Sequence, residues 1–187
     1  VMSFAYVLGR TAQEHPAPSL LDWGGGCGHY ALLARALYPR LALEYHCRDL
    51  PLLAGLGAEF LPGDHFYSDD SCLARRYDLV MANTSFHYNR EWQSRLAGLA
   101  GATGSYFYAG NFPVTTNAES FVFVQRPYAY GYATEYLAWC LNREEFLAEA
   151  ARLGLTLERE FVYGYAPKIH NAPGGAGYRG FLFRAKL

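Results

Sequence analysis

The sequence predicts an α/β fold in which helices cover both faces of a mostly parallel sheet that ends in an antiparallel hairpin. Three observations predict this fold. An apolar strand at residues 19–22 passes through a glycine-rich turn into a helical pattern. Strand-like and helical patterns then alternate along the chain, which is typical of parallel sheets. The last two strand patterns, residues 155–165 and 178–185, are joined by a glycine-rich loop and predict an antiparallel pair.

Length and composition predict a single domain over residues 1–187. A chain of 187 residues can build one full core but is too short for two domains of ordinary size. Its 16 basic and 17 acidic residues give a net charge of -1, which argues against nucleic acid as a partner. No apolar run is long enough for membrane insertion and no signal peptide opens the sequence, so we expect a cytoplasmic protein. Because the sequence begins with Val1 and not methionine, we expect that an N-terminal piece is missing or was trimmed.

Neither disulfides nor a metal site are predicted. The four cysteines are scattered without a C-x-x-C pair, which fits neither a disulfide scaffold nor a zinc site. Asp64, His65, Asp69 and Asp70 lie close together in the sequence, but their spacing matches no known set of metal ligands. We therefore predict that the protein binds no metal.

The first 18 residues are predicted to form an N-terminal helical cap. Phe4, Val7 and Leu8 share one face of a helix over residues 1–14. Two prolines follow directly and end this helix, because proline cannot continue the helical hydrogen bonds. We expect the helix to cover one side of the sheet.

The stretch from residue 19 to residue 30 predicts a strand, a tight turn and the start of a helix. Leu20 and Leu21 supply the apolar strand, and four glycines in the next stretch let the backbone turn closely beneath a ligand. A helical pattern follows as far as Leu37. A strand, a glycine loop and a helix N-terminus together form a cradle for a nucleotide.

The spacing of the glycines allows two interpretations. Gly26, Gly28 and Ala31 match the G-x-G-x-x-G/A fingerprint of dinucleotide-binding proteins. Asp22, Gly24, Gly26 and Gly28 form D-x-G-x-G-x-G, which resembles the first motif of class I S-adenosylmethionine-dependent methyltransferases. An acid near the ammonium and sulfonium groups of that cofactor is favourable, whereas beside a pyrophosphate it would be repelled. We therefore favour the methyltransferase motif.

An acid after the predicted second strand, residues 41–47, is a candidate ribose ligand. Asp49 follows Gly28 by 21 positions, close to the interval of about 20 residues at which such an acid reaches a ribose hydroxyl. Its carboxylate can accept hydrogen bonds from two neighbouring hydroxyls. The alternatives are a helix N-cap or a solvated loop acid, and Glu44 is a competing acid within the strand.

A short third strand is predicted over residues 58–66, ending in G-D-x-F. Together with the D-L-P sequence at Asp49, this ending resembles small-molecule O-methyltransferases. The resemblance implies that Asp64 lies near the adenine amino group. An Asx turn after the strand is the alternative.

Residues 77–83 form an acid, an apolar run and a polar end, the pattern of a central parallel strand. The next residues leave from its carboxyl end, where open α/β sheets bind their ligands. The sequence Y-D-L-V-x-A-N-x-S-x-H-Y, residues 77–88, resembles the fourth-strand motif of the same methyltransferases. A helix over residues 90–100 and a strand over residues 105–109 follow.

Residues 111–139 are the least regular part of the sequence, in the position where the resembling family inserts substrate-contacting segments. Asn142 and Glu145 then form a capping box for a helix that stops at Gly154. The resemblance runs from residue 19 to the end. It implies a three-layer, Rossmann-like sandwich with a seven-stranded sheet, a cofactor-binding half over residues 19–110 and a substrate-side half over residues 111–187.

The resemblance implies a set of cofactor contacts. These predicted cofactor-binding residues are Asp22, Gly24, Gly25, Gly26, Gly28, Asp49, Leu50, Gly63, Asp64, His65 and Asn83.

Methyl transfer from a sulfonium is an in-line displacement, so most of the rate comes from alignment of the two reactants. A hydroxyl acceptor also needs a base. His87 is the predicted base, because it follows the fourth strand and its ordinary pKa lies near neutrality. His170, in the late glycine-rich loop, is the alternative base, and a structural role is the alternative for His87. Tyr88 and Asn111 are predicted to line the acceptor pocket.

The sequence thus predicts a methyltransferase that uses S-adenosylmethionine, releases S-adenosylhomocysteine and methylates a small molecule, with O-methyl transfer favoured. The F-V-x-V-Q segment at residues 121–125, the W-G-G-G loop and the final hairpin look like those of methyltransferases from bacterial surface-polysaccharide gene clusters, which implies a sugar hydroxyl as acceptor. An NAD(P)-dependent oxidoreductase and a non-catalytic binding module with the same fold are the alternatives. Oxygen, nitrogen and carbon acceptors all stay open, as does the oligomeric state.

Overall fold

The computed structural model describes residues 1–186, with the side chain of Tyr130 left out. Within these residues nine strands form one mixed sheet. The strands are β1 (Ser19–Trp23), β2 (Glu44–Arg48), β3 (His65–Tyr67), β4 (Tyr77–Asn83), β5 (Thr103–Thr115), β6 (Phe121–Gln125), β7 (Tyr136–Asn142), β8 (Leu155–Val162) and β9 (Gly177–Ala185). The helices are α1 (Met2–Glu14), α2 (His29–Leu37), α3 (Pro51–Phe60), α4 (Trp92–Gly101) and α5 (Arg143–Arg152), with short 3₁₀ turns η1 (Asp70–Ala74), η2 (Phe86–Tyr88) and η3 (Pro127–Tyr130).

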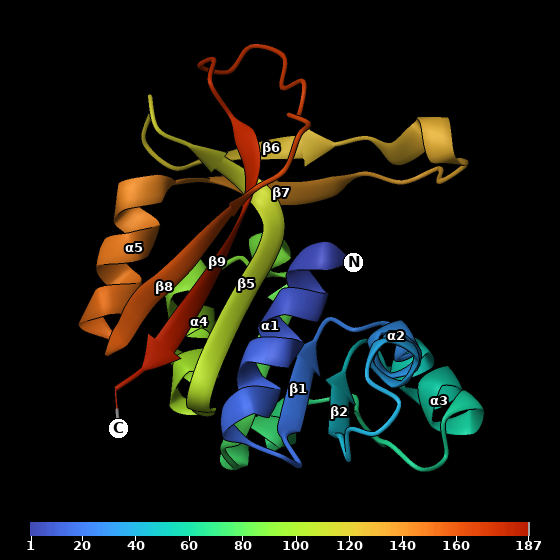
Figure 1. Cartoon of the computed structure of the whole chain (residues 1–187). Helices are drawn as coiled ribbons and strands as arrows, with labels where there is room; N and C mark the ends of the chain where they lie inside the picture. The colour runs from blue at the N-terminus through green and yellow to red at the C-terminus, as the bar shows by residue number, and fades with distance from the viewer. Residues whose placement is uncertain (187) are drawn as a thin grey trace.

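The sheet is parallel from β3 through β2, β1 and β4 to β5. Strand β9 then pairs antiparallel with both β5 and β8, so that β8 and β9 form the closing hairpin. This order confirms the predicted mostly parallel sheet with an antiparallel end, but the sheet has nine strands in the described residues and not the predicted seven, because β6 and β7 add a further hairpin. A second hairpin, β6–β7, joins the sheet through two residue pairs between β5 and β7. Figure 1 shows this hairpin beyond the carboxyl end of β5.

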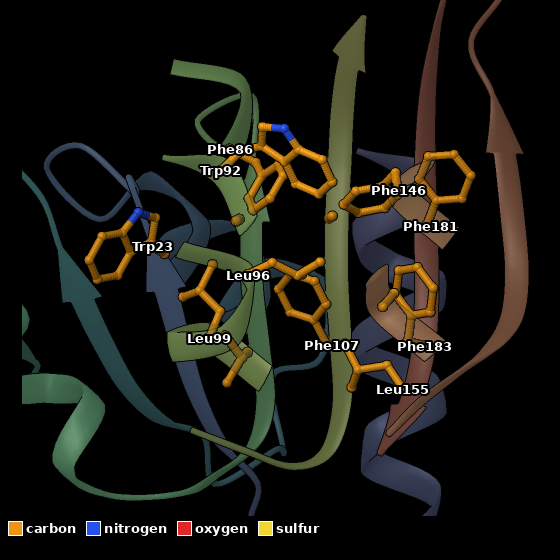
Figure 2. Close-up of a cluster of buried hydrophobic side chains, with 14 of the residues drawn as sticks. Trp23, Phe86, Trp92, Leu96, Leu99, Phe107, Phe146, Leu155, Phe181 and Phe183 are labelled. Carbon is orange, nitrogen blue, oxygen red and sulfur yellow. The ribbon is translucent and has the colours of Figure 1, made fainter. Parts of the chain in front are cut away.

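Helices cover both faces of the sheet, as predicted: α1 lies in front of the sheet in Figure 1 and α4 behind it. Each face has its own hydrophobic cluster. Strand β5 serves both, because its alternate side chains point to opposite faces. Phe107 belongs to the cluster under α4 and α5 (Figure 2), whereas Tyr106 and Tyr108 belong to the cluster under α1 and α2.

The N-terminal helix forms as predicted. Phe4, Val7 and Leu8 are all buried in the cluster on its side of the sheet. Among the described residues, no helix is long and apolar enough to cross a membrane.

The predicted third strand at residues 58–66 is wrong in its position. The chain instead forms α3 over Pro51–Phe60 and a shorter strand, β3, at His65–Tyr67. The close packing of this helix on the strand requires a glycine at position 57. A Cβ added to Gly57 would lie 2.2 Å from Cε1 of Phe66. Short apolar runs do not distinguish a helix end from a strand.

The region predicted as least regular contains two strands and the extended end of β5. Strand β5 runs to Thr115, beyond the predicted end at residue 109. The helix predicted after Asn142 is confirmed as α5, and the Asn142 side chain accepts hydrogen bonds from the backbone N–H groups of Glu144 and Glu145. The capping box closes through Ser120, which donates to the Glu145 carboxylate and accepts from the Asn142 backbone N–H.

Candidate functional site

The carboxyl ends of β1, β2, β4 and β5 meet at one edge of the sheet. Register places Trp23 opposite Arg48 and Asn83 opposite Gly110. The glycine loop follows the first of these strand ends, and Asp49 and Ser85, which come after β2 and β4, lie beside it. Open α/β sheets bind their ligands at this edge.

The glycine loop folds back onto the end of β2. Gly24, Gly26 and Gly28 all have positive φ, and only Gly26 of the three has open space where a Cβ would lie. The Gly24 N–H donates to the Arg48 carbonyl at 2.8 Å, and the Gly26 N–H donates to Oδ2 of Asp49 at 2.7 Å. The loop is therefore held by β2 and keeps an open face at Gly26.

Asp22 lies beneath this loop and is almost completely buried. Its carboxylate accepts a hydrogen bond of 2.6 Å from the Tyr45 hydroxyl. A Cβ added to Gly25 would lie 2.4 Å from Oδ2 of Asp22, so only glycine lets the loop cross the carboxylate this closely. Burial raises the pKa of Asp22 to about 7, with a further contribution from the charge of Asp49.

Asp49 is half-buried and connects the loop to α3. Its two carboxylate oxygens accept from the backbone N–H groups of Gly26 and Leu50, each at 2.7 Å. A carboxylate has about four lone-pair positions, so each oxygen can accept another donor. The neighbouring Leu50 side chain is 63% exposed. An apolar side chain and an acceptor-rich carboxylate thus lie together at the rim of the loop.

Two residues without glycine's freedom adopt positive φ where β4 ends and in the adjoining part of β5. Thr84 has φ 60° and Asn111 has φ 53°. The Asn111 side chain donates to the Thr84 hydroxyl at 3.0 Å, so the two conformations support each other. Backbone strain of this kind concentrates at functional sites. Beside them, Asn83 donates from its amide to the Tyr30 hydroxyl.

The predicted base, His87, is buried, and its Nδ1 has no hydrogen-bond partner among the described residues. Burial lowers the pKa of His87 to about 4. Tyr88, the next residue, is 41% exposed and donates from its hydroxyl to Oε1 of Gln125 at 2.9 Å. The structure therefore brings Tyr88 to the surface of the site and places His87 behind it.

A cleft of about 880 Å³ lies between β6 and the loop that joins β8 to β9. Gln125, His170 and Tyr178 are among the residues that line it. Tyr165 packs against Tyr178 with ring centroids 4.8 Å apart and the rings tilted by 40°, and its hydroxyl donates to Oδ1 of Asn111 at 2.6 Å. The cleft is thus linked to the sheet edge through Asn111 and, by way of Gln125, through Tyr88. Figure 1 shows the loop rising beside β6 and β7.

Three predicted cofactor residues do not reach this edge. Gly63, Asp64 and His65 precede or begin β3, so they lie at the amino ends of the parallel strands and not at the carboxyl ends where the glycine loop lies. Asp64 accepts two hydrogen bonds from Arg35, at 2.6 and 2.8 Å, and His65 stacks on His46. The misplaced strand explains this difference.

The acid that does follow β3 is Asp69. Its side chain accepts from the Ser71 backbone N–H and begins η1. The sequence signal was the acid pair after Tyr67, which becomes informative only when the strand is placed at His65–Tyr67.

One group of possible metal ligands occurs in the described part of the chain. Ligand atoms of Glu44, His46 and His65 lie within 4.8 Å of one another at the amino end of the strands. Arg75 already donates to both oxygens of Glu44, at 2.9 and 3.1 Å. This contact and that of His46 lower the pKa of Glu44 to about 2. A guanidinium therefore supplies the positive charge here.

No protein-family model and no curated protein matches the chain. Solved structures of methyltransferases do match the chain. A Burkholderia thailandensis 1,6-didemethyltoxoflavin-N1-methyltransferase, bound to its substrate and S-adenosylhomocysteine, is 14% identical with a TM-score of 0.65, covering 99% of this chain and 77% of that one. A Brevibacillus brevis O-methyltransferase from a trans-AT PKS multienzyme, with S-adenosylhomocysteine, is 13% identical with a TM-score of 0.69, covering 98% and 71%. A sugar N-methyltransferase from Streptoalloteichus is 14% identical with a TM-score of 0.66, covering 98% and 87%.

The chain has the Rossmann-like fold of S-adenosylmethionine-dependent methyltransferases. At 13% to 14% identity the likeness establishes the fold and leaves the activity and the acceptor to be tested. This methyltransferase fold accounts for the arrangement of the core strands, with β9 between β5 and β8.

Proposed function

We propose that the protein is an S-adenosylmethionine-dependent methyltransferase that acts on a small molecule. The observation that carries the proposal is the contact between Gly26 and Asp49. It joins an open-faced glycine loop to an acid with free lone pairs at the ligand-binding edge of a methyltransferase fold. S-adenosylmethionine supplies an electrophilic methyl group when bound.

The residues at this edge fit such a cofactor. Asp49 would accept from the ribose hydroxyls and Leu50 would cover one face of the adenine, because its side chain is exposed beside that acid. Asp69 replaces Asp64 as the acid proposed for the adenine amino group, since it follows β3. Asp22 would act indirectly by holding Tyr45 and supporting the loop from below.

The acceptor is proposed to lie in the cleft beside Tyr88 and Asn111. Both residues are hydrogen-bonded to the tyrosine and glutamine side chains of its walls and rim. His170 lines the cleft and is exposed, whereas His87 is buried, so accessibility favours His170 as the base if one is needed. Tyr88 and Asn111 would orient the acceptor, and alignment supplies most of the rate of methyl transfer.

The kind of acceptor atom stays a prediction. The similar structures include both an O-methyltransferase and N-methyltransferases. A sugar hydroxyl in surface-polysaccharide biosynthesis is our proposed acceptor from the sequence resemblance, and one of the similar structures is named as a sugar methyltransferase.

Calorimetry with S-adenosylhomocysteine tests the proposal. We expect binding to the wild-type chain and at least a tenfold loss of affinity in Asp49→Asn, because a neutral amide accepts fewer hydrogen bonds than a carboxylate. Asp64→Asn is the matched control, since this acid lies at the other edge and should leave affinity unchanged.

Three other outcomes would contradict the proposal or parts of it. No binding at millimolar concentration would reject the cofactor. Tight binding of NADH in its place would favour an oxidoreductase. Binding of the cofactor without methyl transfer to a broad panel of acceptors would favour a non-catalytic module.

A further inference from the structure

The cleft between β6 and the loop joining β8 to β9 carries an unbalanced positive charge. Its lining residues include Arg126 and Lys168 and no aspartate or glutamate. The chain as a whole has slightly more acidic than basic residues, so this bias is local. From it we infer that the methyl acceptor carries an anionic group, a phosphate or a carboxylate. The inference rests on the proposed function and adds the substrate class.

Ion pairs within the protein neutralise only one of these side chains. Arg126 donates to Oε1 of Glu135 at 2.7 Å, and Tyr128 donates to the same oxygen. Within residues 1–186, neither Lys168 nor His170 makes a hydrogen bond or ion pair, and both are exposed. Lys168 is therefore the cation available to a ligand, and its ammonium can donate three hydrogen bonds to an anion.

Prolines restrict the loop backbone on both sides of these two residues. Pro167 and Pro173 bracket the lining segment and restrict its backbone. Asn171, directly after His170, has φ 57°. A segment restricted in this way loses less conformational freedom when it binds a ligand than an unrestricted one.

The rest of the wall is apolar or neutral. Phe121, Phe123 and Tyr178 supply aromatic surface, and Gln125 supplies a neutral polar group. A volume of about 880 Å³ suits a small organic molecule rather than a single ion. The site thus fits an acceptor with an apolar or ring-shaped body and one anionic end.

Lysine labelling offers a direct test, because the chain contains only two lysines, Lys168 and Lys186. Both are exposed, so Lys186 is an internal control. The probe is pyridoxal 5′-phosphate, an aldehyde that condenses with an amine, loses water and is fixed by borohydride reduction. We expect labelling of Lys168 at least ten times faster than that of Lys186, by peptide mass spectrometry. Pyridoxal, which lacks the phosphate, should show no such preference. Equal labelling of both lysines by the phosphate probe would overturn the inference.

Competition identifies the chemical class. Phenyl phosphate and benzoate are the two anionic competitors, and phenol and benzamide are their neutral counterparts. Protection of Lys168 by either anion and by neither neutral compound would support the inference, and the better anion shows whether phosphate or carboxylate is preferred. Equal protection by charged and neutral compounds would overturn it.

Binding to variants separates this inference from the proposed function. Lys168→Met should weaken binding of the preferred anion at least fivefold and leave S-adenosylhomocysteine binding unchanged. Lys186→Met removes the same charge elsewhere and should change neither. If S-adenosylhomocysteine binds but Lys168→Met has no effect on the anion, the inference fails and the proposed function stands. If the anion binds and S-adenosylhomocysteine does not, the proposed function fails, and with it the identification of the anion as part of a methyl acceptor.

Discussion

The two halves of the chain build their sides of the site in different ways. Over residues 19–110, the loop and its acids are fixed by short hydrogen bonds, the buried one of Asp22 with Tyr45 and the half-buried one of Asp49 with Gly26. Over residues 111–187, the cleft is framed by a hairpin with exposed apolar side chains, among them Leu137 at 67% exposure. The hairpin joins β5 through only two residue pairs.

This difference indicates that the glycine-loop side and the cleft side of the site suit different kinds of ligand. A cofactor of fixed shape suits a rigid loop, and here the hydrogen bonds of Gly24 to Arg48 and of Gly26 to Asp49 hold the loop in place. An acceptor side built from exposed strands and a proline-bracketed loop has fewer packed neighbours and a lower local stability. We expect truncation of buried side chains under the glycine loop to act on folding, and truncation of exposed side chains on the β6–β7 hairpin to leave folding almost unchanged.

The largest expected contrast comes from the same substitution placed in each half. Leu21→Ala removes a completely buried side chain from β1 and should lower the free energy of unfolding by about 2–5 kcal/mol. Leu137→Ala, at an exposed position of β7, should change it by less than about 0.5 kcal/mol. Urea unfolding followed by circular dichroism measures both. Similar losses of unfolding free energy in the two variants would contradict the difference between the two halves.

The next contrast is in how the free energy of unfolding depends on pH, and Asp22 is the group responsible. Burial raises the pKa of Asp22 from its ordinary value of 3.8 to about 7. Between these two pH values the folded state therefore binds a proton that the unfolded state releases. The contribution of the Asp22 carboxyl to the free energy of unfolding is fully present below about pH 4 and is lost as the pH rises towards 7. Wild type should lose about 2 kcal/mol relative to Asp22→Asn between pH 5 and pH 7, from roughly 1.4 kcal/mol per pKa unit. Urea unfolding at several pH values measures this difference, and a constant difference would contradict it.

Glu135 in the second half is the matched control for this measurement. Its contact with Arg126 lowers the pKa of this exposed carboxyl, so its contribution is present at neutral pH and is lost as the pH falls below about 4.5. Glu135→Gln should therefore show no change between pH 5 and pH 7 and the opposite slope in acid.

The first half could be predicted from sequence because its signals are local. The glycine spacing, the interval from Gly28 to Asp49 and the pattern of β4 each depend on a few adjacent residues whose backbone needs are specific. Asp64 shows the limit of this reasoning. The predicted role of Asp64 depended on the residue at which the short strand β3 begins. The packing of Gly57 on Phe66 fixes this start, and it joins residues on two different elements.

The second half gave weaker signals for a physical reason. Strand β6 reads Phe-Val-Phe-Val-Gln, with apolar residues on both faces, so no alternation marks it as a strand. The cleft depends on a contact between β6 and a loop more than 40 residues later, which no local pattern contains. The burial of His87 likewise depends on the surrounding packing and not on its own neighbours in the sequence.

A smaller loss of stability than that of Leu21→Ala is predicted where the hairpin passes into helix α5. Asn142 is the last residue of β7 and accepts from the Glu144 and Glu145 N–H groups at 2.9 and 3.0 Å. Asn142→Ala removes this cap and should lower the free energy of unfolding by about 1 kcal/mol.

Asn142→Asp keeps an acceptor at the helix N-terminus, where negative charge is favourable, and should retain most of the stability in the same urea measurement. Because the Asn142 amide also donates to the Ala118 carbonyl at 2.7 Å, the aspartate variant isolates the helix cap from the contact with the hairpin side. If the alanine and aspartate variants lose the same stability, the contact with residue 118 holds the junction. The hairpin would then depend on α5 less through its cap than through the turn before β6.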